Sequence, residues 1–201
     1  MTGPGIRFHA ATPARWKDVE ELFGARGACA GCWCMWWRLA RPDWTRGKGE
    51  GNRRALRRLV GEGDAPGILA YEGKRPVGWC AIAPREAYPV LERSRTLKRL
   101  DDAPVWSVTC FFVAKDWRRR GLSVRLLDAA CAFAKKKGAT IVEGYPVEPT
   151  GEYPAAWAWT GLRAAFEAAG FAEVARPSRT RPIMRRHLRA AVPRGASSRR
   201  V

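Results

Sequence analysis

Three consecutive arginines and a glycine lie between an apolar segment and a helical pattern. Arg118, Arg119, Arg120 and Gly121 follow the apolar residues 105–113, and apolar residues recur at helical spacing directly afterwards. The first turn of a helix leaves backbone N–H groups unpaired and carries the positive end of the helix dipole, so it attracts anions. Glycine lets the backbone approach an anion closely, and arginine donates charge-assisted hydrogen bonds to phosphate oxygens. An ordinary helix start with a solvated basic face is the alternative, but the position directly after a buried strand favours a pyrophosphate site.

A second group of reactive side chains lies in the segment CAGCWCMWWR, residues 29–38. Cys29, Cys32 and Cys34 show the spacing C-x2-C-x-C, which raises the question of a zinc site. Structural zinc usually takes four protein ligands, and the remaining three cysteines lie in expected strands or in an expected helix. We therefore expect no metal.

A cysteine nucleophile is the other reactive interpretation of this segment. It would need a base, and the only two histidines, His9 and His187, lie in no recognisable catalytic context. The simplest interpretation is that Cys32 and Cys34 pack as small apolar side chains among the neighbouring tryptophans.

The elements that must position these residues follow from the spacing of the apolar side chains. Alternating or continuous apolar runs predict strands, and apolar residues three or four apart predict helices. The run at residues 105–113 is nearly continuous, so it predicts a central strand buried on both faces. We expect strands at residues 6–11, 67–71, 75–84, 105–113, 139–147 and 183–188, and helices at residues 12–23, 52–60, 122–137 and 155–170.

Length and charge limit the class of protein. The chain has 201 residues, 46% of them hydrophobic, which predicts one domain over residues 1–189 and a disordered basic tail over residues 190–201. Lys and Arg outnumber Asp and Glu by 37 to 19, and the net charge of +18 favours anionic partners. No secretory signal pattern and no apolar run of membrane-spanning length is visible, so we expect a cytoplasmic protein with reduced cysteines and no membrane contact.

The arginine-glycine turn and the order of the elements resemble a known family. Residues 113–123, VAKDWRRRGLS, are similar to the signature R/Q-x-x-G-x-G/A of the GNAT superfamily of acyl-CoA-dependent N-acyltransferases, where a strand ending in Val precedes it. Residues 168–171, AAGF, resemble the family's frequent ending LYEKLGF. The similarity extends over about residues 6–188. It implies an α/β fold with a mixed, mostly antiparallel central sheet, flanked by helices, whose central strand pair splays apart.

The same resemblance implies that acetyl-CoA is the acyl donor, with no metal as cofactor. Backbone amides of the arginine turn would hold the pyrophosphate of coenzyme A, and the exposed backbone at the end of the central strand would pair with the pantetheine amides. Ser123 departs from the pattern because Gly or Ala is usual there. The implied cofactor-binding positions are Phe111, Phe112, Val113, Arg118, Arg119, Arg120, Gly121, Leu122 and Ser123.

The implied reaction is direct transfer of an acetyl group to a primary amine. The amine must lose a proton and the leaving thiolate must gain one, so the site needs a base and an acid. Phe166 stands where many members carry a tyrosine that protonates the thiolate, and the central strand has no Asp or Glu. Glu143 on the following strand is the candidate base and Tyr145 the candidate acid. The alternatives are that Glu143 only faces solvent and that Tyr145 only packs.

The aromatic segment is expected to line the acceptor pocket, because in GNAT-like folds the segment after the first helix forms one wall of that pocket. An aromatic wall suits an apolar acceptor, or a cationic one through cation–π contact, whereas Arg38 suits a substrate carboxylate. The chemical identity of the acceptor therefore stays open. The candidate acceptor-binding residues are Cys32, Trp33, Cys34, Trp36, Trp37 and Arg38.

Two other functions fit the same sequence. A nucleic-acid-binding module would use the basic C-terminal third and the abundant tryptophans for base stacking. A degenerate family member would bind acyl-CoA without turnover, which the missing tyrosine and the missing strand carboxylate allow. Members of the resembling family frequently dimerise, so a homodimer is compatible with either enzyme or binding protein.

Overall fold

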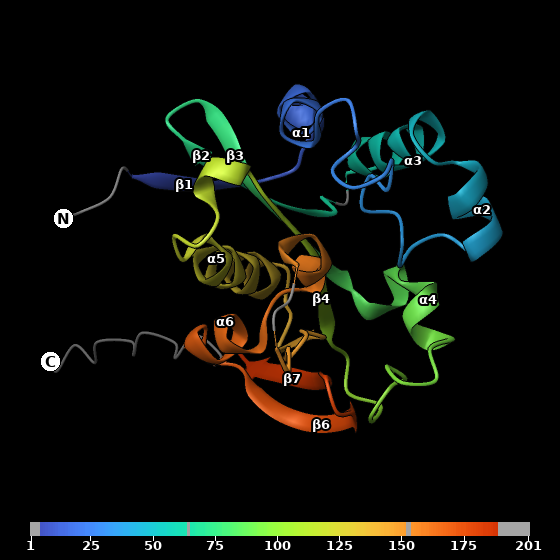
Figure 1. Ribbon diagram of the computed structural model, residues 1–201, viewed down its shortest axis with the longest axis vertical. Helices are drawn as coiled ribbons and strands as arrows, with labels where there is room; N and C mark the ends of the chain where they lie inside the picture. The colour runs from blue at the N-terminus through green and yellow to red at the C-terminus, as the bar shows by residue number, and fades with distance from the viewer. Residues whose placement is uncertain (1–4, 64, 152–153, 189–201) are drawn as a thin grey trace, which may run out of the picture.

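The chain forms one seven-stranded sheet that determines where the candidate residues lie (Figure 1). The computed structural model describes residues 5–63, 65–151 and 154–188, so the expected tail lies outside the described residues. The strand order is β1-β2-β3-β4-β5-β7-β6, and only the β4–β5 pair is parallel. The fold class expected from the sequence is confirmed. The strands are β1 (Ile6–Ala10), β2 (Gly67–Glu72), β3 (Arg75–Pro84), β4 (Trp106–Val113), β5 (Ile141–Gly144), β6 (Ala172–Ser178) and β7 (Arg181–His187).

Helices cover both faces of the sheet. Along β3, Trp79 and Ala81 pack against α1 and α3, whereas Cys80 and Ile82 pack against α5, because successive side chains of a strand point to opposite faces. Apolar side chains therefore fill the space on each side of the central strands. The helices are η1 (Pro13–Arg15), α1 (Trp16–Phe23), α2 (Arg41–Arg46), α3 (Glu50–Gly61), η2 (Arg85–Ala87), α4 (Pro89–Glu92), η3 (Lys115–Trp117), α5 (Leu122–Lys136), η4 (Ala155–Thr160) and α6 (Arg163–Ala168).

The two central strands diverge after a short stretch of pairing. β4 pairs with β3 along its whole length, but it pairs with β5 only where residues 106–108 face residues 142–144. Thr109 forms a bulge, because Cys110 lies opposite Ala81 and Val108 opposite Ile82, which leaves Thr109 without a partner on β3. The β5-facing edge of residues 109–113 thus has no strand partner, and the splay expected from the sequence is present.

The segment expected to be one helix over residues 155–170 is two helices. Gly161 has a φ of 89° and Leu162 is extended, so η4 ends and α6 begins separately. A Cβ at Gly161 would lie 2.7 Å from the Phe166 ring and 2.9 Å from the Phe111 ring. The helical pattern is interrupted because this position needs both a left-handed backbone and the absence of a side chain.

Two further elements escaped the sequence prediction. β6 is largely exposed and shows no alternation of apolar residues, so its sequence carries no strand pattern. α2 is short and buries Trp44 alone among its residues. Among the described residues, no helix is long and apolar enough to cross a membrane.

Candidate active site

The arginine-glycine turn forms an open helix N-terminus. Gly121 precedes α5 with a φ of 71°, and a Cβ there would meet no atom within 4 Å. Arg119 also adopts a left-handed conformation, with a φ of 60°, which is uncommon for a residue with a side chain. Because α5 begins at Leu122, its first backbone amides have no acceptor inside the helix. The local backbone therefore presents donors to open space, as an anion site requires.

The three arginines of the turn are exposed and carry no carboxylate partner among the described residues. Arg118 donates from Nε to the carbonyl oxygen of Val113, at 3.2 Å, and so connects the turn to the end of β4. The Arg120 guanidinium lies 5.4 Å from the centre of the Trp117 ring. The nearest acid in sequence, Asp116, is paired with Arg75 at 2.7 Å. The positive charge of the turn is thus available to an anionic ligand.

The gap between β4 and β5 is bordered by closely packed rings on the α5 face. Phe111 and Phe166 lie with ring centres 6.0 Å apart and nearly perpendicular planes. A Cβ at Gly144 would lie 2.1 Å from the Phe166 ring, so β5 must have glycine where α6 approaches it. Phe166 is fully buried and has no hydroxyl, so this position supplies no acid.

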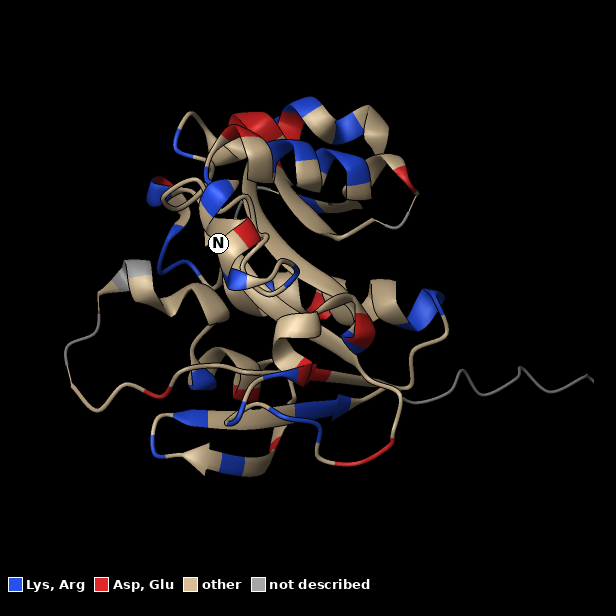
Figure 2. Ribbon diagram, turned by 90° about the vertical axis from the view of Figure 1, so that its right-hand side faces the viewer, with Lys and Arg blue, Asp and Glu red and all other residues tan. Residues whose placement is uncertain are grey.

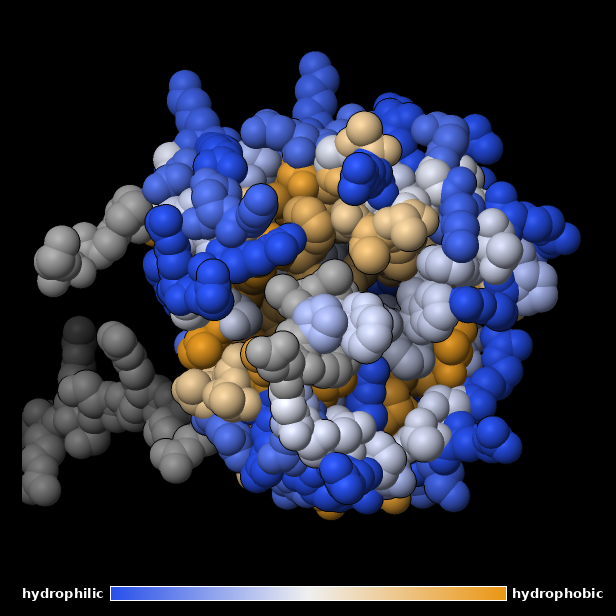
Figure 3. All heavy atoms as spheres, viewed as in Figure 1, coloured by the Kyte–Doolittle hydropathy of each residue, from blue (hydrophilic) through white to orange (hydrophobic). Residues whose placement is uncertain are grey.

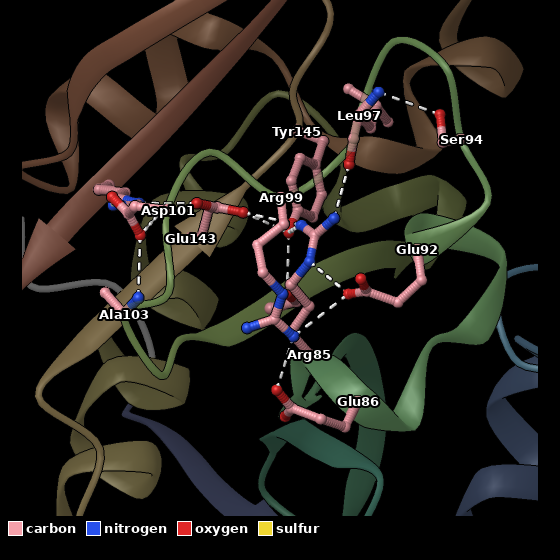
Figure 4. Close-up of polar contacts among 12 residues, drawn as sticks. Arg85, Glu86, Glu92, Ser94, Leu97, Arg99, Asp101, Ala103, Glu143 and Tyr145 are labelled. Atoms are coloured by element: carbon pink, nitrogen blue, oxygen red, sulfur yellow. Dashed lines mark hydrogen bonds and ion pairs between the residues drawn. The ribbon is translucent and has the colours of Figure 1, made fainter.

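A buried network of charges lies where β4 and β5 stop pairing (Figure 4). The Glu143 carboxylate, 1% exposed, accepts a hydrogen bond at 3.0 Å from Arg85 through Oε1 and one at 2.6 Å from Arg185 through Oε2. Arg85 is fully buried and also donates to Glu92 at 2.7 Å and to the carbonyl oxygen of Leu97 at 2.7 Å. The alternative that Glu143 only faces solvent is therefore wrong.

Tyr145 belongs to the same network. Its hydroxyl donates to Glu143 Oε1 at 2.6 Å, accepts from Arg85 at 2.7 Å and lies 2.9 Å from Ser107 Oγ on β4. Burial, followed by the negative charge of Glu143, raises the pKa of Tyr145 well above its usual value. A hydroxyl with such a pKa stays protonated at neutral pH. Glu143, Tyr145 and Ser107 form a hydrogen-bonded chain from β5 to β4, and their roles as base and acid stay predictions.

The aromatic segment after α1 is a loop held in an unusual backbone conformation. Ala28, Ala30, Trp33 and Cys34 all have positive φ values, between 46° and 67°. Non-glycine residues rarely adopt this conformation, and where the surrounding structure maintains it the segment is often functional. The loop therefore has a defined shape that its own sequence does not favour.

Trp33 stabilises the loop from inside the core. Its ring lies 6.1 Å from that of Trp16 and 5.5 Å from that of Phe23, and it is 5% exposed. A Cβ at Gly27 would lie 2.2 Å from the Trp33 indole nitrogen. Trp33 thus anchors the loop to α1.

Cys34 connects the loop to the two central strands. Its sulfur accepts a hydrogen bond from the Trp79 indole N–H at 3.2 Å and another from the Cys110 thiol on β4. The bond from Cys110 lowers the pKa of Cys34 despite the opposing effect of burial, and the same bond raises the pKa of Cys110. Burial raises the pKa of Cys32. Among the described residues, no group of three or more His, Cys, Asp or Glu could hold a metal ion.

Trp36, Trp37 and Arg38 meet residues from distant parts of the chain. The ring of Trp159 in η4 lies 6.2 Å from Trp36 and 6.0 Å from Trp37. Arg38 donates to the Tyr88 hydroxyl at 3.1 Å, and its guanidinium lies 4.4 Å from the Tyr88 ring centre. On the face seen in Figure 3, patches of apolar residues lie above and below a paler centre, within a largely hydrophilic rim.

Sequence reasoning missed several residues of this region. Trp159 carried a visible signal, because the segment AAWAWT is rich in tryptophan, but it was assigned to a continuous helix. Arg85, Ser107 and Arg185 carried no signal, since nothing local distinguishes a buried arginine or serine from a solvated one. Their positions follow only from the strand pairing.

The comparison with known families agrees with this geometry. The model of the acetyltransferase (GNAT) family matches residues 33–154, more than half of the chain, and the chain belongs to this family. That match covers the aromatic segment from Trp33 onward, the splayed strands and the arginine-glycine turn. Among curated proteins, no sequence match was found.

Solved structures of acetyltransferases share the fold at low sequence identity. Polyamine N-acetyltransferase from Drosophila melanogaster is 13% identical, with a TM-score of 0.56, over 92% of this chain and 100% of that one. Mosquito arylalkylamine N-acetyltransferase like 5b is 14% identical, with a TM-score of 0.56, over 92% and 100% of the two chains. PaiA N-acetyltransferase from Thermoplasma acidophilum, in complex with coenzyme A, is 12% identical, with a TM-score of 0.52, over 92% and 99%.

Proposed function

We propose that this protein transfers an acetyl group from acetyl-CoA to a primary amine by direct attack of the amine on the thioester. The observation that carries the proposal is the continuity of two open features. The unpartnered edge of residues 109–113 leads directly, through the turn at residues 114–121, into the exposed N-terminus of α5. An extended ligand with a pyrophosphate at one end and amide groups along its length matches both.

In this arrangement the amides at Gly121, Leu122 and Ser123 hold the pyrophosphate, and the arginines of the turn add charge. The backbone of Phe111, Phe112 and Val113 pairs with the pantetheine amides, because no strand pairs with the β5-facing edge of these residues. The coenzyme A complex of PaiA N-acetyltransferase, a protein of the same fold, supports this choice of donor.

The chemical step needs a proton to leave the amine and one to reach the thiolate of coenzyme A. Glu143 and Tyr145 remain the candidates for these roles, and Ser107 connects their hydrogen-bonded chain to β4 near the bulge. The acceptor wall comprises the loop residues Trp36, Trp37 and Arg38 with Trp159 of η4.

Nucleic acid is a weaker candidate partner. On the face seen in Figure 2, basic residues are spread over helices and strands and alternate with acidic ones, without gathering into one stripe. A polynucleotide groove would need a continuous basic surface.

The test is calorimetric titration with acetyl-CoA at moderate salt, using two matched variants of α5. Gly121→Glu places bulk and negative charge at the N-terminus, and Gly138→Glu does the same just past the C-terminus. Gly138 also has a positive φ, 90°, and open space around its Cβ position. We expect binding by the parent and by Gly138→Glu, and at least about a tenfold loss in Gly121→Glu, since the charge opposes the phosphate. No binding by the parent would overturn the proposal and direct attention to polynucleotides.

A further inference from the structure

Arg38 carries a half-buried positive charge with no negative partner among the described residues. Its guanidinium donates to the Tyr88 hydroxyl at 3.1 Å and to the carbonyl oxygen of Ala87 at 3.4 Å. A guanidinium has five N–H donors, so most of its donors are left for another group. Charges withdrawn from water are usually paired, and an unpaired one that lines a binding region indicates an anionic ligand.

Arg38 is connected to the point where the strands diverge. The Tyr88 hydroxyl that Arg38 contacts also interacts with the side chain of Thr109, the bulge residue of β4. One tyrosine side chain, that of Tyr88, therefore lies between the Arg38 guanidinium and the start of the unpartnered edge of β4. An acceptor held by Arg38 would have its other end near this edge, where the proposed function places the thioester.

The aromatic side chains nearby are already in contact with cations of the protein itself. The Arg41 guanidinium lies 3.9 Å from the Trp36 ring centre and 4.8 Å from that of Trp44, and the Lys48 ammonium also lies 4.8 Å from Trp44. Arg38 contacts Tyr88 in the same way. A cage for a cationic acceptor needs free aromatic faces and no neighbouring cation. On this wall, Arg41 already lies over the Trp36 ring, and Arg38 adds a second cation.

The acidic residues around the wall are engaged with other arginines. Glu86 pairs with Arg99 at 2.8 Å, and Glu92 pairs with Arg85 at 2.7 Å. On α2, Asp43 pairs with Arg46. These three carboxylates are therefore engaged and do not neutralise Arg38.

A second donor on the wall also lacks an acceptor. The indole nitrogen of Trp37 is buried and has no hydrogen-bond partner among the described residues. A buried donor without a partner costs about 1–3 kcal/mol, so a ligand acceptor atom would be stabilising there. The wall therefore offers a ligand aromatic surface and hydrogen-bond donors.

We propose that the acceptor is a primary amine that also carries a carboxylate and an apolar or aromatic body, and that Arg38 binds this carboxylate. The inference rests on the proposed acetyl transfer and specifies its substrate class. It selects one of the alternatives that the sequence left open, because Arg41 already lies over the Trp36 ring of the wall and Arg38 gives the wall a positive charge. Polyamines and other dications are the substrates it disfavours.

The first experiment measures the acetylation of matched amines, with the release of free coenzyme A as the readout. L-Phenylalanine, L-phenylalaninamide and 2-phenylethylamine share one ring and one primary amine, and only the first has a carboxylate; agmatine serves as the dication. We expect kcat/KM to be highest for L-phenylalanine. Arg38→Gln should reduce that value about 10- to 100-fold, the range for a lost charged hydrogen bond, and leave 2-phenylethylamine nearly unchanged.

Two further variants separate the effect of the Arg38 charge from an effect of the substitution on folding. Arg38→Lys keeps the charge and should retain part of the preference for the carboxylate, whereas Arg57→Gln, on the exposed face of α3, should behave as the parent. A parent preference for 2-phenylethylamine or agmatine would overturn the inference. An equal loss by Arg38→Gln on every amine would do the same.

A binding experiment tests the inference without turnover. 3-Phenylpropionate has the ring and the carboxylate but no amine, so it cannot react. It should bind the parent saturated with coenzyme A and bind Arg38→Gln at least about tenfold more weakly. Equal binding to both proteins would refute the role of Arg38. Failure of the proposed function has a different signature, because acetyl-CoA itself would then not bind or would not be turned over with any amine.

Discussion

The Tyr145 hydroxyl lies 2.9 Å from Ser107 Oγ, and this contact joins the residue directly after β5 to β4 where the two strands stop pairing. The same hydroxyl bonds to Glu143 and Arg85, so one oxygen connects both sides of the splay. Substitution of Tyr145 by phenylalanine would leave three buried polar groups short of one partner each. The free energy of unfolding should fall by about 1–3 kcal/mol, measured by urea denaturation.

The control for this prediction is Tyr71→Phe. Tyr71 donates one hydrogen bond, to Asp18 at 2.6 Å, and belongs to β2, away from the splay. It should lose less stability than Tyr145→Phe and no activity. If Tyr145 is the acid of the reaction, its variant should also lose kcat at temperatures where it is fully folded. Unchanged kcat would leave Tyr145 with a structural role alone.

Glu143 neutralises two arginines in the interior, and its replacement by glutamine should be strongly destabilising. Arg85 and Arg185 would keep Glu92 and Asp101 as partners but would lose the shared carboxylate. Removing one member of a buried ion pair costs about 3–5 kcal/mol, so urea denaturation should show a loss near the lower end of that range. Glu167→Gln, which removes a half-exposed pair with Arg163, should cost less than about 1 kcal/mol.

The catalytic hypothesis for Glu143 predicts more than instability. A base removes a proton from the attacking amine, so a folded Glu143→Gln should lose kcat by about 100-fold or more. Measurement of kcat at a temperature well below unfolding of the variant decides between the two roles. Full activity of a folded Glu143→Gln would exclude it as the base.

The sequence was informative where a feature depends on consecutive residues. The turn at Arg118 to Gly121 combines a strand end, a glycine and a helix start within a few positions. Because this geometry is local, the sequence predicted a strand before the turn and a helix after it, and the structure has both. The break at Gly161 was missed because the apolar spacing continues through it, and only contact with Phe111 and Phe166 requires the glycine. Arg85 and Trp159 reach the site through strand order and loop packing, which no local pattern encodes.

Asp101 should contribute to the loss of stability in acid. Its hydrogen bond with Arg185 holds the pKa of Asp101 below its usual value of 3.8. A carboxyl whose pKa is lower in the folded state contributes stability above the unfolded pKa and loses it as the pH falls through the folded pKa. The urea midpoint should therefore show no effect of this group from pH 7 to about 5, and should fall below about pH 4.

Asp101→Asn should flatten this acid slope, because the amide does not titrate. Asp102→Asn is the matched control, since Asp102 is an exposed neighbour that forms no ion pair with the described residues. Urea midpoints of the three proteins between pH 3 and pH 7 would make the comparison. Identical slopes for the parent and Asp101→Asn would show that other carboxyls, such as those of Glu86 and Asp116, account for the acid sensitivity.

Cys34 should contribute to stability as a hydrogen-bond acceptor rather than as a small apolar side chain. The fully buried Trp79 donates its indole N–H to the Cys34 sulfur at 3.2 Å, and this N–H has no other acceptor among the described residues. Cys34→Ala would leave the N–H buried without a partner and should lower the free energy of unfolding by about 1–3 kcal/mol. Cys34→Ser keeps an acceptor atom and should lose less. Urea denaturation of both variants separates the two interpretations: if serine and alanine are equally destabilising, packing of the sulfur, and not the bond from Trp79, explains why cysteine stands in this left-handed position.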